Sequence, residues 1–337
     1  MKKNLFTFLL LALCLTGCQN GEKPSTSNTT ELPTSSSSTI EQKNATIISP
    51  KGTPAIAIAN YAINHQDDVE LVAGPDALVA AFTGGTKDII VAPINLGAMR
   101  YNSGNTTYRL YRTIVWDNLY VVSRTKINSI EDLKDKDITS FGKGSTPQIV
   151  LETIFNHANF AKDKITYTDN VVSALSMFNT NQADIVISAQ PNVSSLTPND
   201  TDLFVTSLST FWKDATNLET YPQSGIFVKN DSLNQIKDTL TAIDEQYNTI
   251  NENVENTAKN AAQLLDMKEA LLKKAIPNCG YKVVEDEFTY VKGYYQAMID
   301  LGLDKGAARP NDIPRHCSRH SNPAPPSLRR NGSRTVL

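Results

Sequence analysis

The sequence has few cysteines, and their number argues against a fold that depends on disulfide bonds. Only four occur in 337 residues, whereas small secreted domains held by disulfides carry more. Two of them, Cys14 and Cys18, stand at the end of an apolar amino-terminal run. The other two, Cys279 and Cys317, could pair, and the sequence leaves that pairing open.

Histidine is also scarce, with His65 and His157 the only two before residue 309. Neither stands in a motif that would place it beside a serine or cysteine nucleophile. No His-Glu-x-x-His, Cys-x-x-Cys or calcium-loop pattern occurs, and these are the short motifs that indicate metal sites or redox chemistry. We therefore expect a protein that is not an enzyme and holds neither a metal nor a cofactor.

No apolar run is long enough to cross a membrane. The longest, residues 5–15, follows Lys2 and Lys3, and its length of about eleven residues is short of the roughly twenty that a span requires. A basic start, a short apolar run and small residues before a cleavage site are typical of a signal peptide, here residues 1–17. The run ends in Leu15-Thr-Gly-Cys18.

Those four residues resemble the lipobox of bacterial lipoproteins. The resemblance implies cleavage before Cys18, lipidation of that cysteine by acyl chains such as palmitate, and a place on the extracytoplasmic face of the cell membrane. Two or three acyl chains anchor a protein stably without a transmembrane helix. The alternative is an ordinary secretory signal with an incidental cysteine.

Aromatic residues are absent from residues 18–44, which are rich in Ser, Thr, Asn and Glu. Such a segment buries too little apolar surface to offset its ordering entropy, so we expect a flexible tether. Residues 307–337 contain six arginines and one acid, Asp312. We expect a disordered basic tail there, in which His316, Cys317 and His320 are not held as a metal site. The remaining chain carries a net charge of −8, which argues against a nucleic-acid partner.

Short apolar stretches alternate with helical ones from residue 46, and this alternation predicts an α/β fold. Strands are expected at residues 46–49, 69–73, 88–92, 113–115, 119–123, 137–140, 164–167, 184–188, 203–205 and 225–229. Helices are expected at residues 54–64, 75–82, 147–158 and 171–179, and again after Ser232. Thr53 and Ser129 are predicted to cap the helices that follow them, because a hydroxyl at that position accepts a backbone N–H.

Four segments occur in an order that resembles a known family. They are residues 49–54 (Ser-Pro-Lys-Gly-Thr-Pro), 88–93 (Asp-Ile-Ile-Val-Ala-Pro), 129–147 (from Ser-Ile-Glu-Asp-Leu-Lys to Phe-Gly-Lys-Gly-Ser-Thr-Pro) and 182–191 (Gln-Ala-Asp-Ile-Val-Ile-Ser to Gln-Pro). This order resembles the solute-binding lipoproteins of ABC importers, in the group that includes sulfonate-, nitrate- and thiamine-precursor-binding proteins. The resemblance covers residues 46–305.

The resemblance implies a type II periplasmic-binding-protein fold of two lobes with a cleft between them. Residues 46–112 and 225–306 would form lobe one, and residues 113–224 lobe two. It further implies a monomer that captures a small polar or anionic solute and delivers it to an ABC permease in the membrane. The alternatives are an enzyme on the same fold, as in some menaquinone-pathway proteins, and a surface adhesin or sensory lipoprotein.

The loop at residues 142–147 is the strongest candidate for ligand contact. Its glycines, of which Gly144 is the second, allow a tight turn between strand and helix. Backbone amides of the helix start, with the hydroxyls of Ser145 and Thr146, would then offer donors to an anionic or carbonyl-bearing ligand. The alternative is an ordinary capped turn.

Other candidates follow the predicted strands or lie where the chain passes between lobes. Thr53 begins a helix after the first strand, and Asn95 follows the third with both donor and acceptor atoms. Trp116 lies at the first passage and either stacks on a ligand or packs in the core. Gln190 follows the strand at residues 184–188, and Tyr221 lies at the return passage.

Overall fold

The computed structural model describes residues 41–104, 106–196 and 203–304. The predicted signal peptide, the lipidation site Cys18, most of the predicted tether and the arginine-rich tail with Cys317 lie outside these residues. None of the described helices is long and apolar enough to cross a membrane.

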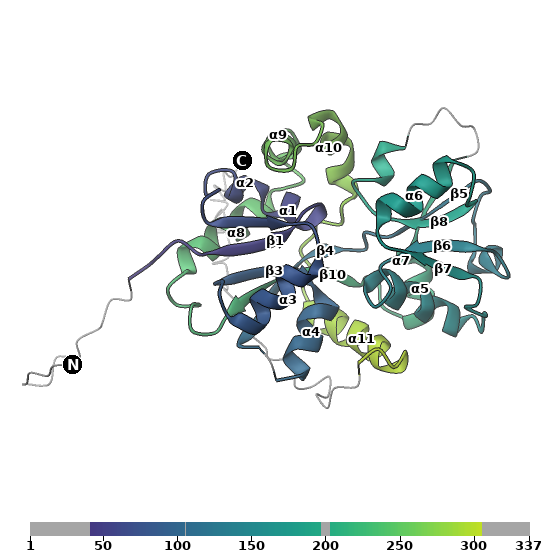
Figure 1. The fold of residues 1–337 in the computed structure, drawn as a ribbon, viewed down its shortest axis with the longest axis horizontal. Coiled ribbons are helices and arrows are strands. Elements are labelled where there is room, and N and C mark those ends of the chain that lie inside the picture. Colours follow the sequence, from purple (N-terminus) through teal and green to yellow (C-terminus); the bar gives the residue numbers. More distant parts are fainter. Residues whose placement is uncertain (1–40, 105, 197–202, 305–337) are drawn as a thin grey trace, which may run out of the picture. The chain divides into compact units, whose positions relative to one another are not determined.

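Two five-stranded sheets organise the described chain (Figure 1), and helices alternate with their strands as the α/β pattern predicted. The first has the order β2-β1-β3-β10-β4, formed by Val69–Val72, Ile47–Pro50, Ile89–Pro93, Pro222–Lys229 and Tyr108–Trp116. The second has the order β7-β6-β8-β5-β9, formed by Ile165–Thr168, Ile138–Phe141, Ile185–Ser188, Tyr120–Ser123 and Phe204–Ser207. The fold is therefore α/β with two lobes, each built on one sheet.

The helices connect these strands. They are α1 Thr53–Ala57, α2 Ala59–Ala62, α3 Pro75–Gly84, α4 Ile94–Asn102, α5 Thr146–His157, α6 Val171–Asn179, α7 Leu208–Thr216, α8 Lys237–Asn248, α9 Val254–Leu265, α10 Glu269–Ala275 and α11 Glu287–Asp300. Three short 3₁₀ helices, η1 Ile130–Leu133, η2 Val193–Ser195 and η3 Ile276–Asn278, complete the described elements. Ser129 caps η1 through a reciprocal capping box with Asp132, as the sequence predicted.

Alternate residues of the central strands are buried on opposite faces. In β3, Ile90 and Ala92 join one apolar cluster, while Ile89 and Val91 join another. This period of two is what a pleated strand imposes, and burial on both faces explains the continuous apolar run Ile-Ile-Val-Ala. The first of these clusters also contains residues of the second sheet, such as Val121, so one core runs through both lobes.

The structure corrects one predicted helix and adds two that were not expected. The helix expected at residues 54–64 is two short helices, because Ile58 leaves the helical conformation at φ −110° and ψ 8°. Helices α4 and α7 were not predicted at all. Their sequences contain Gly, Asn, Ser and Thr, which favour helices weakly, and tertiary packing decides them: Phe211 and Trp212 of α7 are buried.

The chain passes between the sheets beside Trp116 and Tyr221, the residues that the sequence placed at the two passages, but the lobe limits differ from those expected. Strand β4 runs to Trp116 and β10 begins at Pro222. The lobe limits inferred from the sequence, residues 113 and 225, fall inside these two strands. Because β4 and β10 pair along most of their length, the four residues up to Trp116 stay with the first sheet.

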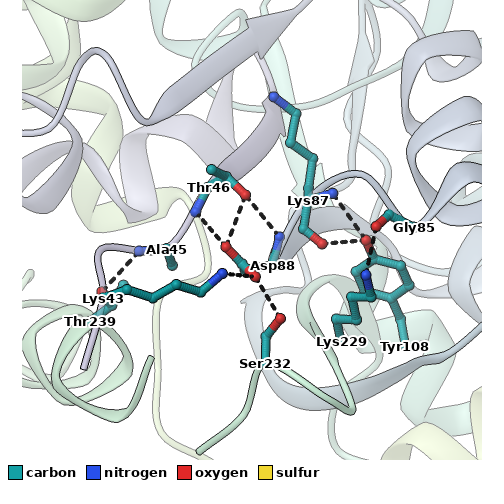
Figure 2. A network of polar contacts seen from close by, with 10 residues as sticks. All are labelled: Lys43, Ala45, Thr46, Gly85, Lys87, Asp88, Tyr108, Lys229, Ser232 and Thr239. Atoms are coloured by element: carbon teal, nitrogen blue, oxygen red, sulfur yellow. Dashed lines mark hydrogen bonds and ion pairs between the residues drawn. The ribbon is translucent and has the colours of Figure 1, made fainter. Parts of the chain in front are cut away.

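The chain joins the fold earlier than the predicted tether limit of residue 44. The backbone N–H of Lys43 donates to the Gln235 carbonyl at 2.9 Å, and its ammonium lies 2.8 Å from the carboxylate of Asp88 (Figure 2). That carboxylate also accepts bonds from Thr46 and Ser232. Asp88 is 5% exposed, so this buried acid fastens residues 43–46 to the first lobe.

Asp88 predicts an acid-dependent loss of stability. Burial alone would raise the pKa of this carboxyl, but hydrogen bonds from Lys43, Ser232 and Thr46 outweigh burial and lower the pKa from 3.8 to about 2. A carboxyl with a depressed pKa stabilises the fold fully above its unfolded pKa, and the contribution is lost as pH falls toward about 2. We expect Asp88→Asn to lower the free energy of unfolding by about 2 kcal/mol at pH 7.

Urea unfolding between pH 2 and 7 measures this difference. It should shrink steadily below pH 4, because the wild-type carboxyl then becomes protonated as well. Asp67→Asn, at an exposed acid of the same lobe, serves as the control and should change stability by less than about 0.5 kcal/mol. A loss at Asp88 that is independent of pH would contradict the argument.

Candidate functional site

The candidate residues gather at the carboxyl edges of the two sheets. Strands β1 and β3 are parallel, and β4 runs the same way because both β3 and β4 pair antiparallel with β10. Parallel strands end at one edge of a sheet, and in open α/β folds ligands bind at that edge. Thr53, Asn95 and Trp116 follow or end these three strands. In the second sheet, the loop before α5 follows β6 and Gln190 follows β8.

Thr53 and Gln190 are joined directly across the two lobes. The Thr53 hydroxyl donates to the Gln190 carbonyl oxygen at 2.7 Å, and both residues are 6% exposed. The predicted capping role of Thr53 is wrong: Gly52, at φ 94°, precedes α1 and Thr53 is its first residue. The hydroxyl is therefore available for the contact with Gln190.

Asn118 completes this contact and was missed in the sequence. Its amide nitrogen donates to the Thr53 hydroxyl at 3.0 Å and to the Gln190 carbonyl at 3.3 Å, and its oxygen accepts the Gln190 N–H at 2.8 Å. The side chain is 1% exposed. The available signal was its place directly after Trp116-Asp117, where the chain passes between sheets.

Asn95 and the glycine loop form a second contact between the lobes. The Asn95 amide nitrogen donates to the Gly144 carbonyl at 3.2 Å, and Gly144 holds φ +78°. The Ser145 hydroxyl donates to the Gly142 carbonyl at 2.8 Å, so it closes the loop and contacts none of the other candidates. Of the three residues predicted here, Gly144 and Thr146 reach the other lobe and Ser145 does not.

A cluster of aromatic side chains adjoins Thr146. Its hydroxyl lies 2.9 Å from the Tyr294 hydroxyl, and the Trp212 ring lies 6.3 Å from the Tyr294 ring and 5.4 Å from the Tyr221 ring. Burial raises the pKa values of Tyr221 and Tyr294 far above the ordinary tyrosine range. Both phenols are therefore neutral hydrogen-bonding groups at physiological pH. Trp212 and Tyr294 were not predicted as site residues.

Trp116 is buried in the core of the first lobe at 1% exposure. Its ring packs edge-on against Tyr290 with 6.2 Å between the centroids. Asp117, the next residue, donates its N–H to the Tyr221 carbonyl at 3.2 Å. The carboxylate of Asp117 is engaged by the N–H of Tyr221 and by the Lys282 ammonium at 3.0 and 2.6 Å. The two passages between lobes are thus tied together beside Trp116.

Five buried polar atoms of these residues and their neighbours have no hydrogen-bond partner among the described residues. They are the indole nitrogens of Trp116 and Trp212, the hydroxyls of Ser188 and Tyr221, and the Asn95 amide oxygen. Leaving a buried polar group unpaired costs about 1–3 kcal/mol, and such groups in a folded protein call for an explanation. Four of the five can donate, so the arrangement suits a ligand that supplies acceptor atoms.

Comparison with known proteins identifies the fold. Solved structures with the same fold include an ABC transporter from Parabacteroides distasonis, with a TM-score of 0.65 and 18% identity over 82% of this chain and 100% of that one. The periplasmic aliphatic sulphonate binding protein SsuA from Escherichia coli has a TM-score of 0.60 and 14% identity over 76% of this chain and 87% of its own. The fold is that of the type II periplasmic-binding proteins.

The periplasmic nitrate-binding protein NrtA from Synechocystis PCC 6803 shares the fold as well, with a TM-score of 0.56 and 11% identity over 80% of this chain and 84% of its own. The sequence profile of the NMT1/THI5-like family matches residues 68–253. This chain therefore belongs to the NMT1/THI5-like family. No curated protein sequence matches it.

Proposed function

We propose that this protein is the solute-binding component of an ABC importer and captures a small polar or anionic solute between its two lobes. The observation that carries the proposal is the group of buried, unpartnered polar atoms near the facing strand ends, chiefly the hydroxyls of Ser188 and Tyr221 and the indole nitrogen of Trp212 in α7. A solute with acceptor atoms would satisfy these donors without any charged partner. The sulphonate- and nitrate-binding proteins that share the fold make oxygen-rich anions the first class to test.

The contacts between the lobes support a trap mechanism. Thr53 bonds Gln190 and Asn95 bonds the Gly144 carbonyl, so each lobe supplies polar groups to the other. A ligand that contacts both lobes favours the closed arrangement by its difference in affinity for the two states. A permease would then recognise the closed form. In the same proposal, lipid on Cys18 holds a monomer on the extracytoplasmic face of the membrane, near that permease.

An enzyme on this fold is the weaker proposal. The Cys279 thiol is buried, and burial raises its pKa to about 12, so the reactive thiolate does not form at physiological pH. His65 stacks on the ring of Tyr61 at 4.0 Å and bonds the Tyr61 carbonyl, so its ring is engaged locally. Among the described residues, no group of three or more His, Cys, Asp or Glu side chains could hold a metal ion.

A thermal-shift screen tests the proposal. The full chain is heated with alkanesulfonates, nitrate, pyrimidines and amino acids, and a bound solute raises the melting temperature by mass action. Trp212→Phe keeps an aromatic ring and removes one donor. We expect it to weaken binding of the solute that scores in the screen about tenfold, because one hydrogen bond contributes about 1.4 kcal/mol.

Tyr111→Phe is the matched control. Like Trp212→Phe, it removes one hydrogen-bond donor from an aromatic side chain. The Tyr111 hydroxyl, however, bonds Asp244 in the first lobe and contacts none of the candidate residues. Its solute affinity should equal that of the wild type. An unchanged affinity in Trp212→Phe would place the solute elsewhere and remove the support for this site.

A further inference from the structure

A pocket separate from the candidate site lies in the first lobe. It has a volume of about 520 Å³ and is bordered by α2, α8 and α9 together with the turns that follow α2 and α8. None of its lining residues belongs to the candidate site. Its size falls within the range of roughly 300–1,000 Å³ that small-molecule sites occupy.

Helix α9 and the residue that precedes it contribute a stripe of carboxamide side chains to this pocket. They are Asn253, Asn256, Asn260 and Gln263, whose spacing of three, four and three residues places them on one face of a helix. The face that α9 buries carries different residues, including Thr257, Ala258 and Ala261. The carboxamide stripe is therefore separate from the packing face of the helix.

The neighbouring helices also contribute carboxamide side chains to the pocket. Asn60 and Asn64, four residues apart, come from α2 and the turn after it, and Gln246 comes from α8. The amide nitrogen of Asn260 donates to the Asn60 oxygen at 2.9 Å, and the Asn60 nitrogen donates to the Thr257 hydroxyl at 2.9 Å. These two bonds set the orientation of the central amides. The Gln246 amide oxygen is buried without a hydrogen-bond partner among the described residues.

The lining excludes most classes of ligand. Lys259 is the single charged residue and Ile63 the single apolar one among the lining residues. An anion would meet only one cationic side chain. A metal ion would find no carboxylate, thiolate or imidazole ligand. An apolar ligand would find almost no apolar surface to contact. A peptide would find only Ile63 as an apolar contact for its side chains, although peptide recognition relies on such contacts for specificity.

A neutral ligand rich in hydroxyl groups fits this lining. Each carboxamide offers two donors and an acceptor, and each hydroxyl of a sugar both donates and accepts. We propose that the pocket binds a neutral carbohydrate, independently of the solute at the interlobe site. The unpartnered oxygen of Gln246 would accept a hydroxyl of the bound sugar.

Saturation-transfer NMR of the full chain with maltose, lactose, cellobiose and chitobiose tests this proposal. At least one of these disaccharides should receive saturation from the protein. The double substitution Asn256→Ala and Gln263→Ala removes two exposed amides from the stripe and leaves the buried face of α9 intact. It should reduce the transferred signal at least fivefold.

Two controls separate this site from the other. Asn156→Ala changes an exposed asparagine of α5 in the second lobe, and Trp212→Phe changes the interlobe site. Both should leave the disaccharide signal at its wild-type level. The proposal would be overturned if none of the four sugars received saturation, or if trialanine received it in place of the sugars. It would also be overturned if the signal persisted in the double variant or was lost in Trp212→Phe.

Discussion

Replacing Gly280 with alanine is expected to lower the free energy of unfolding by about 3–5 kcal/mol. Gly280 holds φ +76°, and a Cβ added there would lie 1.6 Å from the carbonyl oxygen of Trp116. A left-handed conformation costs a non-glycine residue about 1–3 kcal/mol, and overpacking costs about 1–3 kcal/mol more. The obstructing atom belongs to the backbone, so no side-chain rotation relieves the overlap.

The same substitution should also weaken solute binding. The Gly280 carbonyl accepts the N–H of Trp116 at 3.0 Å, and the hydroxyl of Tyr281, the next residue, donates to the Thr53 carbonyl at 2.8 Å. Displacing this segment would therefore shift both Trp116 and Thr53. Urea unfolding measures the loss as a lower midpoint at constant slope, and the thermal-shift assay measures binding on the variant at a temperature where it remains folded.

Gly302→Ala is the matched control for Gly280. Its φ is +67°, but nothing lies within 4 Å of an added Cβ. Only the conformational cost applies there, and we expect a loss of about 1 kcal/mol. Equal losses at Gly280 and Gly302 would show that the contact with Trp116 is absent in solution.

Replacing Asn118 with leucine should destabilise the protein by about 2–4 kcal/mol and reduce solute affinity. Leucine has a similar size but forms none of the three hydrogen bonds to Thr53 and Gln190. The Gln190 N–H would be left buried without its partner, and an unsatisfied buried donor costs about 1–3 kcal/mol in addition to the lost bonds. Because these bonds join the two lobes, the variant should bind solute more weakly even where it is fully folded.

Asn128→Leu controls for the asparagine-to-leucine change itself. Asn128 is exposed at the start of the η1 turn, and a surface substitution of this kind changes stability by about 0.5 kcal/mol or less. Chemical unfolding and solute titration on both variants complete the comparison. A loss below about 1 kcal/mol at Asn118, or an affinity equal to that of the wild type, would contradict its role in joining the lobes.

The strands of the central sheets were predictable because their chemistry is local. The strands predicted at residues 88–92 and 184–188 contain the continuous apolar runs of residues 89–92 and 185–187, and they match β3 and β8 within one residue at each end. The helix predicted at residues 171–179 matches α6 in full, and Asn170 caps it through its side chain. Helices α4 and α7 lacked such local signals, and the burial of Trp212 against Tyr221 and Tyr294 became visible only in the fold.

The sequence by itself determined the alternation of strands and helices and the loops that carry the candidate site, while the two-lobed class followed from the resemblance of four segments to a known family. The alternation and the loops depend on periodicity, capping and glycine conformations, which neighbouring residues dictate. Only the tertiary structure decided which donors and acceptors form hydrogen bonds with one another. Thr53 bonds a residue 137 positions away and Thr146 one that lies 148 positions away. The Thr53 hydroxyl contacts the other lobe instead of capping its own helix because the chain between them folds into two sheets whose carboxyl edges meet.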